Sequence, residues 1–194
     1  MSQTEFLRQL KAYGLENDIP NISENNAKII RGFLRKKQSK KVLEIGMANA
    51  YSTIHFAEEI AEWDGEIYSF EISIPGFSQA QENIKKSGLK NIHTFHQNFL
   101  HSPVEKLAPF DTVFIDARKS EYKQYIIEIQ KYITDDALII IDDVIKWKHK
   151  MPDFYEYMEM QNIFSYEIIQ TDPDDGIMVI WGKNTKLQET KVQK

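Results

Sequence analysis

The chain has 194 residues and a formal net charge of -5 at pH 7, a length at which one domain can bury a core without disulfides or metal staples. The acidic balance, with a pI near 5.6, argues against a broad phosphate-binding face for long nucleic acids. Cysteine is absent, which excludes a disulfide framework, a thiolate zinc site and a cysteine nucleophile.

The amino-terminal segment MSQTEFLRQLKAYG is amphipathic and charged, whereas a secretion signal has an apolar centre followed by small residues. No apolar run approaches the roughly 20 residues that a membrane-spanning helix needs. We therefore expect a soluble cytoplasmic protein with no membrane partner.

Two amphipathic helices are predicted before the first strand. Apolar residues within 6–13 predict a first helix that ends near Gly14, and Ser23 begins a second helix whose apolar residues fall within 29–34. A basic cluster at residues 35–41 follows. We interpret it as a solvated helix end that complements the helix dipole, with an RNA contact as the alternative.

The rest of the chain alternates predicted strands with predicted helices. The strands are expected at residues 42–45, 66–71, 92–96, 111–116, 137–141, 163–170 and 177–181. Only residues 171–176 join the last two strands, too few for a helical crossover, so these strands should be antiparallel neighbours. The predicted fold class is α/β, with a mostly parallel seven-stranded sheet, a C-terminal antiparallel hairpin and helices on both faces.

Residues 40–52, KKVLEIGMANAYS, combine a buried strand, a turn at Gly46 and a helix that begins near Ser52. In an α/β sheet this combination makes a crevice at the carboxyl end of the strand, where nucleotide-like ligands bind. Glu71 lies 25 residues beyond Gly46, where a carboxylate can accept hydrogen bonds from ribose hydroxyls. A surface carboxylate is the alternative interpretation of Glu71.

Acidic residues lie in or directly after four of the predicted strands, at Glu44, Glu71, Asp116 and the pair Asp142 and Asp143. The carboxyl ends of parallel strands share one edge of a sheet, so we expect these side chains to converge. The last three are hard oxygen ligands, which suit magnesium, manganese or calcium. Any one of them alone could equally be a helix cap or a turn residue.

The order of VLEIG, Tyr51-Ser52, Glu71, FIDARKSEY at 114–122 and IIIDDV at 139–144 resembles the S-adenosylmethionine-dependent O-methyltransferases related to catechol and caffeoyl-CoA O-methyltransferases. The resemblance implies a Rossmann-like methyltransferase fold and metal-assisted methyl transfer to a hydroxyl of a small catechol-like or hydroxylated aromatic acceptor. We expect a single domain over residues 1–194, with N-terminal helices over the site at 1–38, the core at 39–182 and a polar, mobile tail at 183–194.

The resemblance also implies roles for individual residues. The implied contacts with S-adenosylmethionine come from Ile22, Glu44, Gly46, Tyr51, Ser52, Glu71, Ile72, Asn98, Phe99 and Asp116. The implied ligands of a divalent cation are Asp116, Asp142 and Asp143. Lys119 matches the lysine that serves some relatives as general base, with Asp116 beside it as a catalytic residue. A solvent-facing lysine is the alternative for Lys119.

Two departures from the family pattern matter for function. Residues 47–50, Met-Ala-Asn-Ala, stand where the family usually has further glycines. We expect Asn49 to replace a glycine, because asparagine tolerates positive φ, and Ala50 to crowd the cofactor. Asp143 stands where asparagine is more usual, and Trp147 is interpreted as a core aromatic, with a substrate wall as the alternative.

Three alternative functions remain from sequence. One is O-methylation of a hydroxyuridine in tRNA, and another is a catalytically weak protein of the same fold that binds the cofactor. A nicotinamide dehydrogenase is disfavoured because the chain lacks G-x-G-x-x-G. By analogy with relatives, a homodimer is a further expectation.

Overall fold

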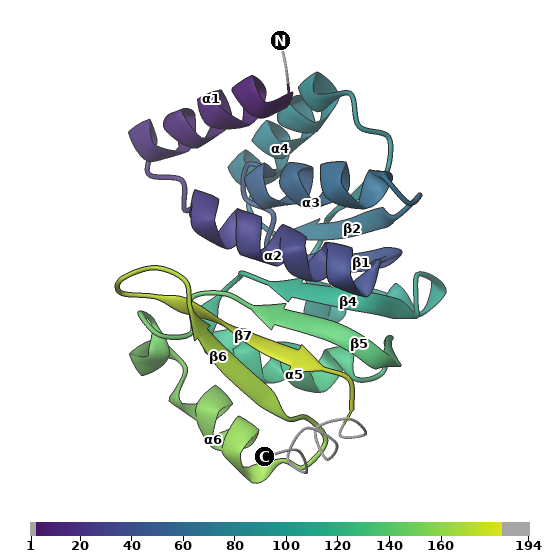
Figure 1. The fold of residues 1–194 in the computed structure, drawn as a ribbon, viewed down its shortest axis with the longest axis vertical. Helices are drawn as coiled ribbons and strands as arrows, with labels where there is room; N and C mark the ends of the chain where they lie inside the picture. The colour runs from purple at the N-terminus through teal and green to yellow at the C-terminus, as the bar shows by residue number, and fades with distance from the viewer. Residues whose placement is uncertain (1–2, 184–194) are drawn as a thin grey trace.

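Seven strands form one sheet, in the order β3-β2-β1-β4-β5-β7-β6, in the computed structural model, which describes residues 3–183 (Figure 1). The strands are β1 (Lys41–Ile45), β2 (Glu66–Glu71), β3 (Ile92–His96), β4 (Phe110–Ile115), β5 (Ile133–Ile141), β6 (Tyr166–Gln170) and β7 (Gly176–Trp181). Strand β7 runs antiparallel to both of its neighbours, and the other pairs are parallel. The predicted mostly parallel sheet with a C-terminal antiparallel hairpin is confirmed. Except for Lys183, the tail predicted to be mobile lies outside the described residues.

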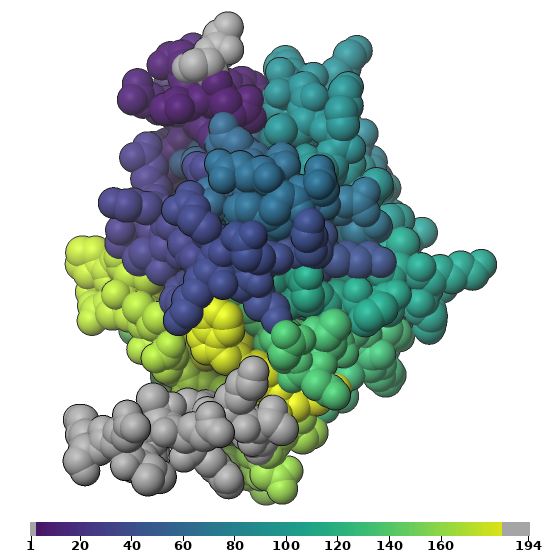
Figure 2. All heavy atoms as spheres, turned by 45° about the vertical axis from the view of Figure 1, so that its right-hand side comes forward, coloured from purple at the N-terminus to yellow at the C-terminus, as the bar shows by residue number. Residues whose placement is uncertain are grey.

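Helices cover both faces of the sheet, as predicted. They are α1 (Gln3–Glu16), α2 (Glu24–Lys37), α3 (Tyr51–Ala61), α4 (Ile74–Ser87), α5 (Tyr122–Ile129) and α6 (Pro152–Met160). Apolar residues of α1 to α4 pack in a cluster on one face, and those of α5 and α6 pack in a cluster on the other. In Figure 1, α2 and α3 lie in front of the sheet and α5 behind it. In Figure 2 the purple and blue atoms of α1 to α3 form a continuous layer, with yellow atoms of β7 visible at its lower edge.

Strand β5 supplies residues to both clusters because its side chains alternate between the two faces. Ile139 and Ile141 belong to the cluster with α5 and α6, whereas Leu138 and Ile140 belong to the cluster with α1 to α4. All four are fully buried. Because β5 is covered on both faces, nearly all of its side chains are apolar, and this explains the continuous apolar run in its sequence.

Some predicted boundaries were wrong. Helix α1 continues past Gly14 to Glu16. A Cβ at Gly14 would overlap the side-chain amide of Asn21, so this glycine permits close packing and does not end the helix. The segment between β4 and β5 enters its helix through a 3-10 turn, η3 (Lys119–Glu121), and becomes α-helical at Tyr122.

The sheet places three residues of the predicted site side by side. Strand β1 lies between β2 and β4, and Ile45 is in register with Phe70 on one side and Ile115 on the other. The residues that follow these three are Gly46, Glu71 and Asp116. The chain order along the sheet reverses at β1, so this edge is the switch point at which α/β sheets bind ligands. None of the helices in residues 3–183 combines the length and apolar character needed to span a membrane.

Candidate functional site

A cavity of about 990 Å³ opens at the carboxyl ends of β1, β2 and β4. Most of the predicted site residues line it: Ile22, Gly46, Ser52, Glu71, Ile72, Asn98, Phe99, Asp116, Lys119 and Asp143. Glu44, Tyr51 and Asp142 do not line this cavity. The wall of the cavity combines residues near position 20 with residues that follow strands β1, β2 and β4. These segments are far apart in the sequence, so the wall forms only when the sheet is complete.

Gly46 allows the backbone of β1 to pass close to β4. Its φ is 95°, in the left-handed region, and a Cβ at this position would overlap the carbonyl oxygen of Asp116. Only glycine satisfies both the torsion angle and the close approach. The amide of Gly46 also donates to the Phe70 carbonyl at 3.0 Å, which ties the turn to β2.

The loop after Gly46 takes its unusual backbone shape through alanines and not through Asn49. Ala48 and Ala50 have φ values of 46° and 69°, whereas Asn49 is absent from the positive-φ residues of the described chain. The Asn49 side chain is buried and accepts a hydrogen bond from the Tyr51 amide at 3.2 Å. Ala50 is fully buried and does not line the cavity, so the expectations for Asn49 and Ala50 were both wrong.

Glu71 fixes this loop from the neighbouring strand. Its Oε2 accepts hydrogen bonds from the Ala48 amide at 2.8 Å and the Met47 amide at 3.2 Å, and its Oε1 accepts one from the Ser73 amide at 2.7 Å. An ionised carboxylate offers about four acceptor positions. Glu71 lines the cavity, so it can hold the loop and still accept a hydrogen bond from a ligand hydroxyl.

Glu44 has a different environment, and the expectation that it lines the cavity is corrected. Its side chain is fully buried and accepts hydrogen bonds from Ser52 Oγ at 2.6 Å, Thr53 Oγ1 at 2.6 Å and Ser69 Oγ. Burial raises the pKa of Glu44 to about 7, although the three hydroxyls act in the opposite direction. Glu44 therefore anchors the start of α3 to the sheet and orients Ser52, which does line the cavity.

Tyr51 also faces away from the predicted position. It lines a second cavity of about 490 Å³ between α1, α2 and α3, where its ring lies 4.7 Å from the ring of His55. Lys11 Nζ lies 5.4 Å from the centre of the Tyr51 ring. The first residue of α3 points toward the N-terminal helices, and the next residue, Ser52, points toward the large cavity.

One end of the large cavity has apolar walls that suit a planar ring. Phe99 is almost fully buried and packs edge-on against Phe70, with ring centres 5.7 Å apart. The Asn98 Oδ1 accepts a hydrogen bond from the Leu100 amide at 2.9 Å and caps the 3-10 turn η1 (Phe99–His101). Ile72, the residue after Glu71, also lines the cavity. It is 47% exposed and offers an apolar surface to a ligand.

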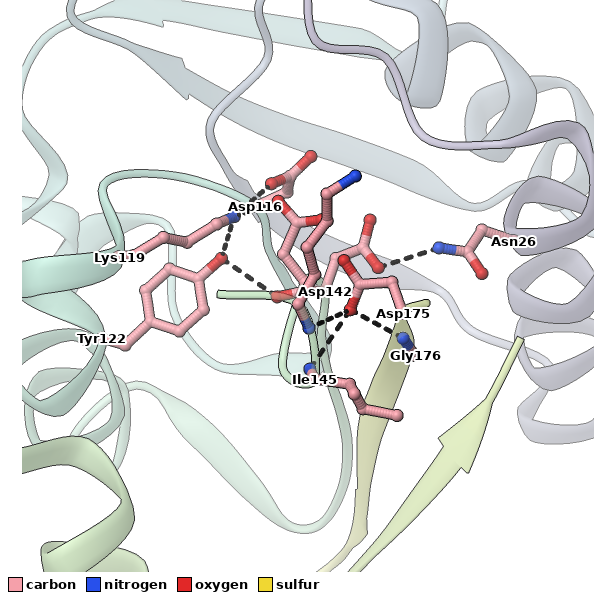
Figure 3. Close-up of polar contacts among 10 residues, drawn as sticks. Asn26, Asp116, Lys119, Tyr122, Asp142, Ile145, Asp175 and Gly176 are labelled. Atoms are coloured by element: carbon pink, nitrogen blue, oxygen red, sulfur yellow. Dashed lines mark hydrogen bonds and ion pairs between the residues drawn. The ribbon is translucent and has the colours of Figure 1, made fainter. Parts of the chain in front are cut away.

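Lys119 lines the same cavity and contacts Asp116 and Tyr122 (Figure 3). Its Nζ is 2.9 Å from Asp116 Oδ1, 2.7 Å from Asp143 Oδ2 and 2.6 Å from the Tyr122 hydroxyl. Burial alone would lower the pKa of Lys119, but Asp116, Tyr122 and Asp143 outweigh it and raise that pKa above its usual value. Lys119 is therefore an ammonium ion in this arrangement.

The third predicted metal ligand, Asp142, does not line the cavity and bonds instead to a residue of α2. It is 3% exposed, and its Oδ1 accepts a hydrogen bond from Asn26 Nδ2 at 2.9 Å (Figure 3). Burial, and then the charges of Asp116 and Asp143, raise the pKa of Asp142 well above its usual range. Burial and Asp116 also raise the pKa of Asp143 to about 6.

These carboxylates have the right chemistry for a hard cation but not the right arrangement. Within residues 3–183 no three His, Cys, Asp or Glu side chains are grouped so that they could hold a metal ion. Lys119 Nζ lies between Asp116 and Asp143, and Asp142 bonds to Asn26. The residues as arranged do not fit the predicted metal site.

Comparison with known proteins identifies the family. The sequence model of the family described as O-methyltransferase matches residues 1–179. The chain belongs to the O-methyltransferase family. This agrees with the resemblance found from VLEIG, Glu71 and the two acidic strand ends.

Curated members of the O-methyltransferase family share part of the sequence. A catechol O-methyltransferase of Niastella koreensis is 32% identical over 131 residues, which are 65% of this chain and 59% of that protein. A caffeoyl-CoA O-methyltransferase of Populus kitakamiensis is 24% identical over 141 residues, or 70% of this chain and 59% of that protein. The matched segment thus spans somewhat more than half of these relatives.

Solved structures in the same family share the fold. The O-methyltransferase of Bacillus cereus in complex with SAH has a TM-score of 0.80 at 21% identity, covering 93% of this chain and 92% of that chain. TomG of Streptomyces achromogenes, in complex with SAM, has a TM-score of 0.80 at 22% identity, covering 94% and 92%. The Rossmann-like methyltransferase fold expected from the sequence is therefore confirmed.

Three polar residues of this O-methyltransferase family member were missed from sequence as parts of the site. Asn26 contacts Asp142, the Tyr122 hydroxyl contacts Lys119, and Asp175 Oδ1 accepts hydrogen bonds from backbone amides, including Ile145 at 3.1 Å. Tyr122 lies in the motif at 114–122 and Asp175 in the link at 171–176, and neither has a role in the site predicted from sequence. No local sequence signal indicates the partner of Asn26, which is 116 residues away.

Proposed function

We propose that this protein is an S-adenosylmethionine-dependent O-methyltransferase whose acceptor is a hydroxyl group of a small aromatic molecule. The observation that carries this proposal is a single cavity lined both by Gly46 and Glu71 and by Lys119 with its partners Asp116 and Asp143. Such a cavity has room for a nucleoside cofactor and an acceptor together. Family membership supports the reaction class, and the names of the two curated relatives support a catechol-like or hydroxycinnamoyl acceptor.

The cofactor would occupy the end of the cavity beside β1 and β2. Glu71 would accept hydrogen bonds from the ribose hydroxyls, Asn98, Phe99 and Ile72 would border the adenine, and Gly46 would leave space for the methionine part. When bound, S-adenosylmethionine would supply an electrophilic methyl group on a sulfonium, in line with the acceptor oxygen. Ile22 would close this end from the N-terminal side, where it is 5% exposed and lines the cavity.

The acceptor oxygen must lose a proton as it takes the methyl group. We assign the proton to the carboxylate of Asp116, which lines the cavity directly beside Gly46. The raised pKa of Lys119 counts against its predicted role as a base. Lys119 instead would stabilise the negative charge that develops on the acceptor oxygen, which is the usual task of a fixed cation in an active site.

The apolar and aromatic part of the cavity wall favours a flat, largely apolar acceptor. Tyr13, Ile19, Pro20 and Trp147 contribute to this wall. Trp147 also packs against the core, so the two interpretations offered from sequence are compatible. Aromatic walls bind aromatic rings through stacked or edge-on contacts, which supports a small hydroxylated aromatic acceptor.

The tRNA alternative loses part of the basic surface that supported it. The basic residues at the end of α2 lie at the edge where β1 begins, opposite the cavity. Arg35 pairs with Glu59 at 2.6 Å, and Lys37 pairs with Asp136 at 2.6 Å. A second basic group, Lys146, Lys148 and Lys150, follows β5 and is exposed, and Lys150 lines the cavity, so tRNA stays the second candidate. The homodimer, the cytoplasmic location and the single-domain organisation remain predictions.

Formation of S-adenosylhomocysteine over a panel of acceptors tests the proposal. We expect product with catechols or hydroxylated aromatic acids and none with tRNA. The Lys119→Met variant should lower kcat by about a hundredfold or more, whereas Lys148→Met, an exposed lysine that does not line the cavity, should not change it. Cofactor binding without turnover on any acceptor would favour the catalytically weak alternative and contradict the proposal.

A further inference from the structure

Every proton of the Lys119 ammonium has a partner in the folded chain. An ammonium has three N–H donors, and Lys119 Nζ lies within hydrogen-bond distance of Asp116 Oδ1, Asp143 Oδ2 and the Tyr122 hydroxyl. The Lys119 side chain is only 13% exposed. Lys119 is thus held at three points in a largely buried position, unlike a mobile surface lysine.

The ammonium occupies the place between the ends of two neighbouring strands. Asp116 follows β4 and Asp143 follows β5 by one further residue, and the two strands pair in parallel up to Ile115 and Ile141. A divalent ion bridging Asp116 and Asp143 would lie within a few ångströms of Lys119 Nζ, where two positive charges repel strongly. A metal could enter only if Lys119 gave up its contacts.

The surrounding residues hold this arrangement in place. The Tyr122 hydroxyl, which accepts from Lys119, donates to the Asp142 carbonyl at 3.2 Å. Asp143 has a left-handed backbone, with φ of 62°. Asp175 Oδ1 accepts hydrogen bonds from the amides of Ile145 at 3.1 Å and Lys146 at 3.2 Å, which fixes the turn that carries Asp143 (Figure 3).

The remaining carboxylate is not free to complete a metal site. Asp142 Oδ1 accepts from Asn26 Nδ2 at 2.9 Å, and both side chains are almost fully buried. Moving Asp142 toward the cavity would leave the Asn26 amide without an acceptor in a buried position, which costs free energy. Asn26 therefore holds the Asp142 side chain in its buried position.

We propose that the Lys119 ammonium is the built-in cation of this site and takes the place that a divalent metal would otherwise fill. In this arrangement the positive charge of Lys119 offsets part of the negative charge of Asp116 and Asp143, and a bound acceptor meets a fixed ammonium group without metal. The inference deepens the proposed function, because it names the cation that serves the same cavity. Metal binding can be measured without cofactor or acceptor, so its test is separate from the test of methyl transfer.

Titration with Mn²⁺, followed by the electron paramagnetic resonance signal of the free ion, tests this directly. The wild-type protein should bind Mn²⁺ no more tightly than the Asp116→Asn variant, which has lost one carboxylate. Lys119→Met removes the cation but keeps the length of the side chain and all three carboxylates. It should bind Mn²⁺ at least about tenfold more tightly than the wild type, because the repelling charge is gone.

The folding of Lys119→Met and the Mn²⁺ affinity of a double variant are measured as well. Circular dichroism establishes that Lys119→Met is folded, and Mn²⁺ should raise its melting temperature but not that of the wild type. The double variant Lys119→Met, Asp143→Asn should lose the gained affinity. The inference is overturned if the wild type binds Mn²⁺ as tightly as Lys119→Met does. It is also overturned if a folded Lys119→Met gains no affinity.

Discussion

Two glutamates on adjacent strands show how burial decides what a residue does. Glu44 and Glu71 both lie close to the loop after β1, but Glu44 is fully enclosed and bonded to hydroxyls, whereas Glu71 bonds to loop amides and lines the cavity. Both positions are acidic in the sequence, and the family resemblance implied a cofactor contact for both. The three hydroxyl partners of Glu44 come from two different elements, so its enclosure could not be seen before the fold was known.

Glu44 should make stability depend on pH. Its pKa is raised from 4.5 to about 7 in the folded chain, so the folded state binds more protons than the unfolded state between these values. The free energy of unfolding should therefore fall as pH rises through this window, by about 3 kcal/mol from this residue. Denaturant unfolding of the wild type and Glu44→Gln at pH 4.5 and 7.5 isolates the effect. An equal pH dependence in both proteins would contradict it.

The loop after Gly46 should be strained at Ala50. Ala50 and Ala57 are both fully buried, but Ala50 has φ of 69° and Ala57 lies within helix α3. Glycine relieves the left-handed strain at residue 50 and loses helix propensity at residue 57. Ala50→Gly should thus be more stable than Ala57→Gly by about 2 kcal/mol. Both variants lose one buried methyl group, so this loss cancels when their free energies of unfolding are compared. Equal free energies of unfolding would show that Ala50 is unstrained.

At the scale of elements, the β6–β7 hairpin holds the turn after β5 in place. Its turn carries Asp175, whose Oδ1 accepts hydrogen bonds from the amides of Ile145 at 3.1 Å, Lys146 at 3.2 Å and Gly176 at 2.7 Å. The antiparallel strand β7 thereby fixes the turn after β5, which carries Asp143. The hairpin is therefore part of the scaffold of the site as well as the edge of the sheet.

Removal of the Asp175 carboxylate should loosen this connection. Asp175→Ala leaves the buried Gly176 amide and the half-buried Ile145 and Lys146 amides without this acceptor, and should lower the free energy of unfolding by about 2–3 kcal/mol. Asp174→Ala provides a matched control, because Asp174 is 68% exposed and its carboxylate pairs with Lys146 at 3.2 Å on the surface. Its effect should stay within about 0.5 kcal/mol. Similar losses for the two variants in denaturant unfolding would rule out the scaffold role of Asp175.

The strands and the hairpin could be predicted from the sequence more fully than the side-chain contacts of the site. Alternation of apolar and polar residues, the apolar run at 137–141 and the short 171–176 link were enough to predict the sheet and its hairpin. Boundaries shifted where packing overrode local signals, as at Gly14. Pairs such as Asn26 with Asp142 and Lys119 with Asp143 depend on strand neighbours and on charge, and single-residue patterns carry no information on either.

At the scale of the whole molecule, the cavity is a consequence of strand order. Reversal of the chain order at β1 leaves an opening at the carboxyl ends of β1, β2 and β4, and the N-terminal segment around Ile22 closes one side. Ligand binding should therefore stabilise the entire fold. Saturating S-adenosylhomocysteine, at about 100 times its dissociation constant, should add roughly 2.7 kcal/mol to the free energy of unfolding. An unchanged melting temperature with this ligand would count against a cofactor site.

A crystal structure of the protein soaked with S-adenosylhomocysteine tests the central claim most directly. We expect difference density in the cavity beside Gly46, with both ribose hydroxyls within hydrogen-bond distance of the Glu71 carboxylate and the sulfur facing Lys119. Density at another place on the molecule, or an empty cavity at saturating ligand, would contradict it.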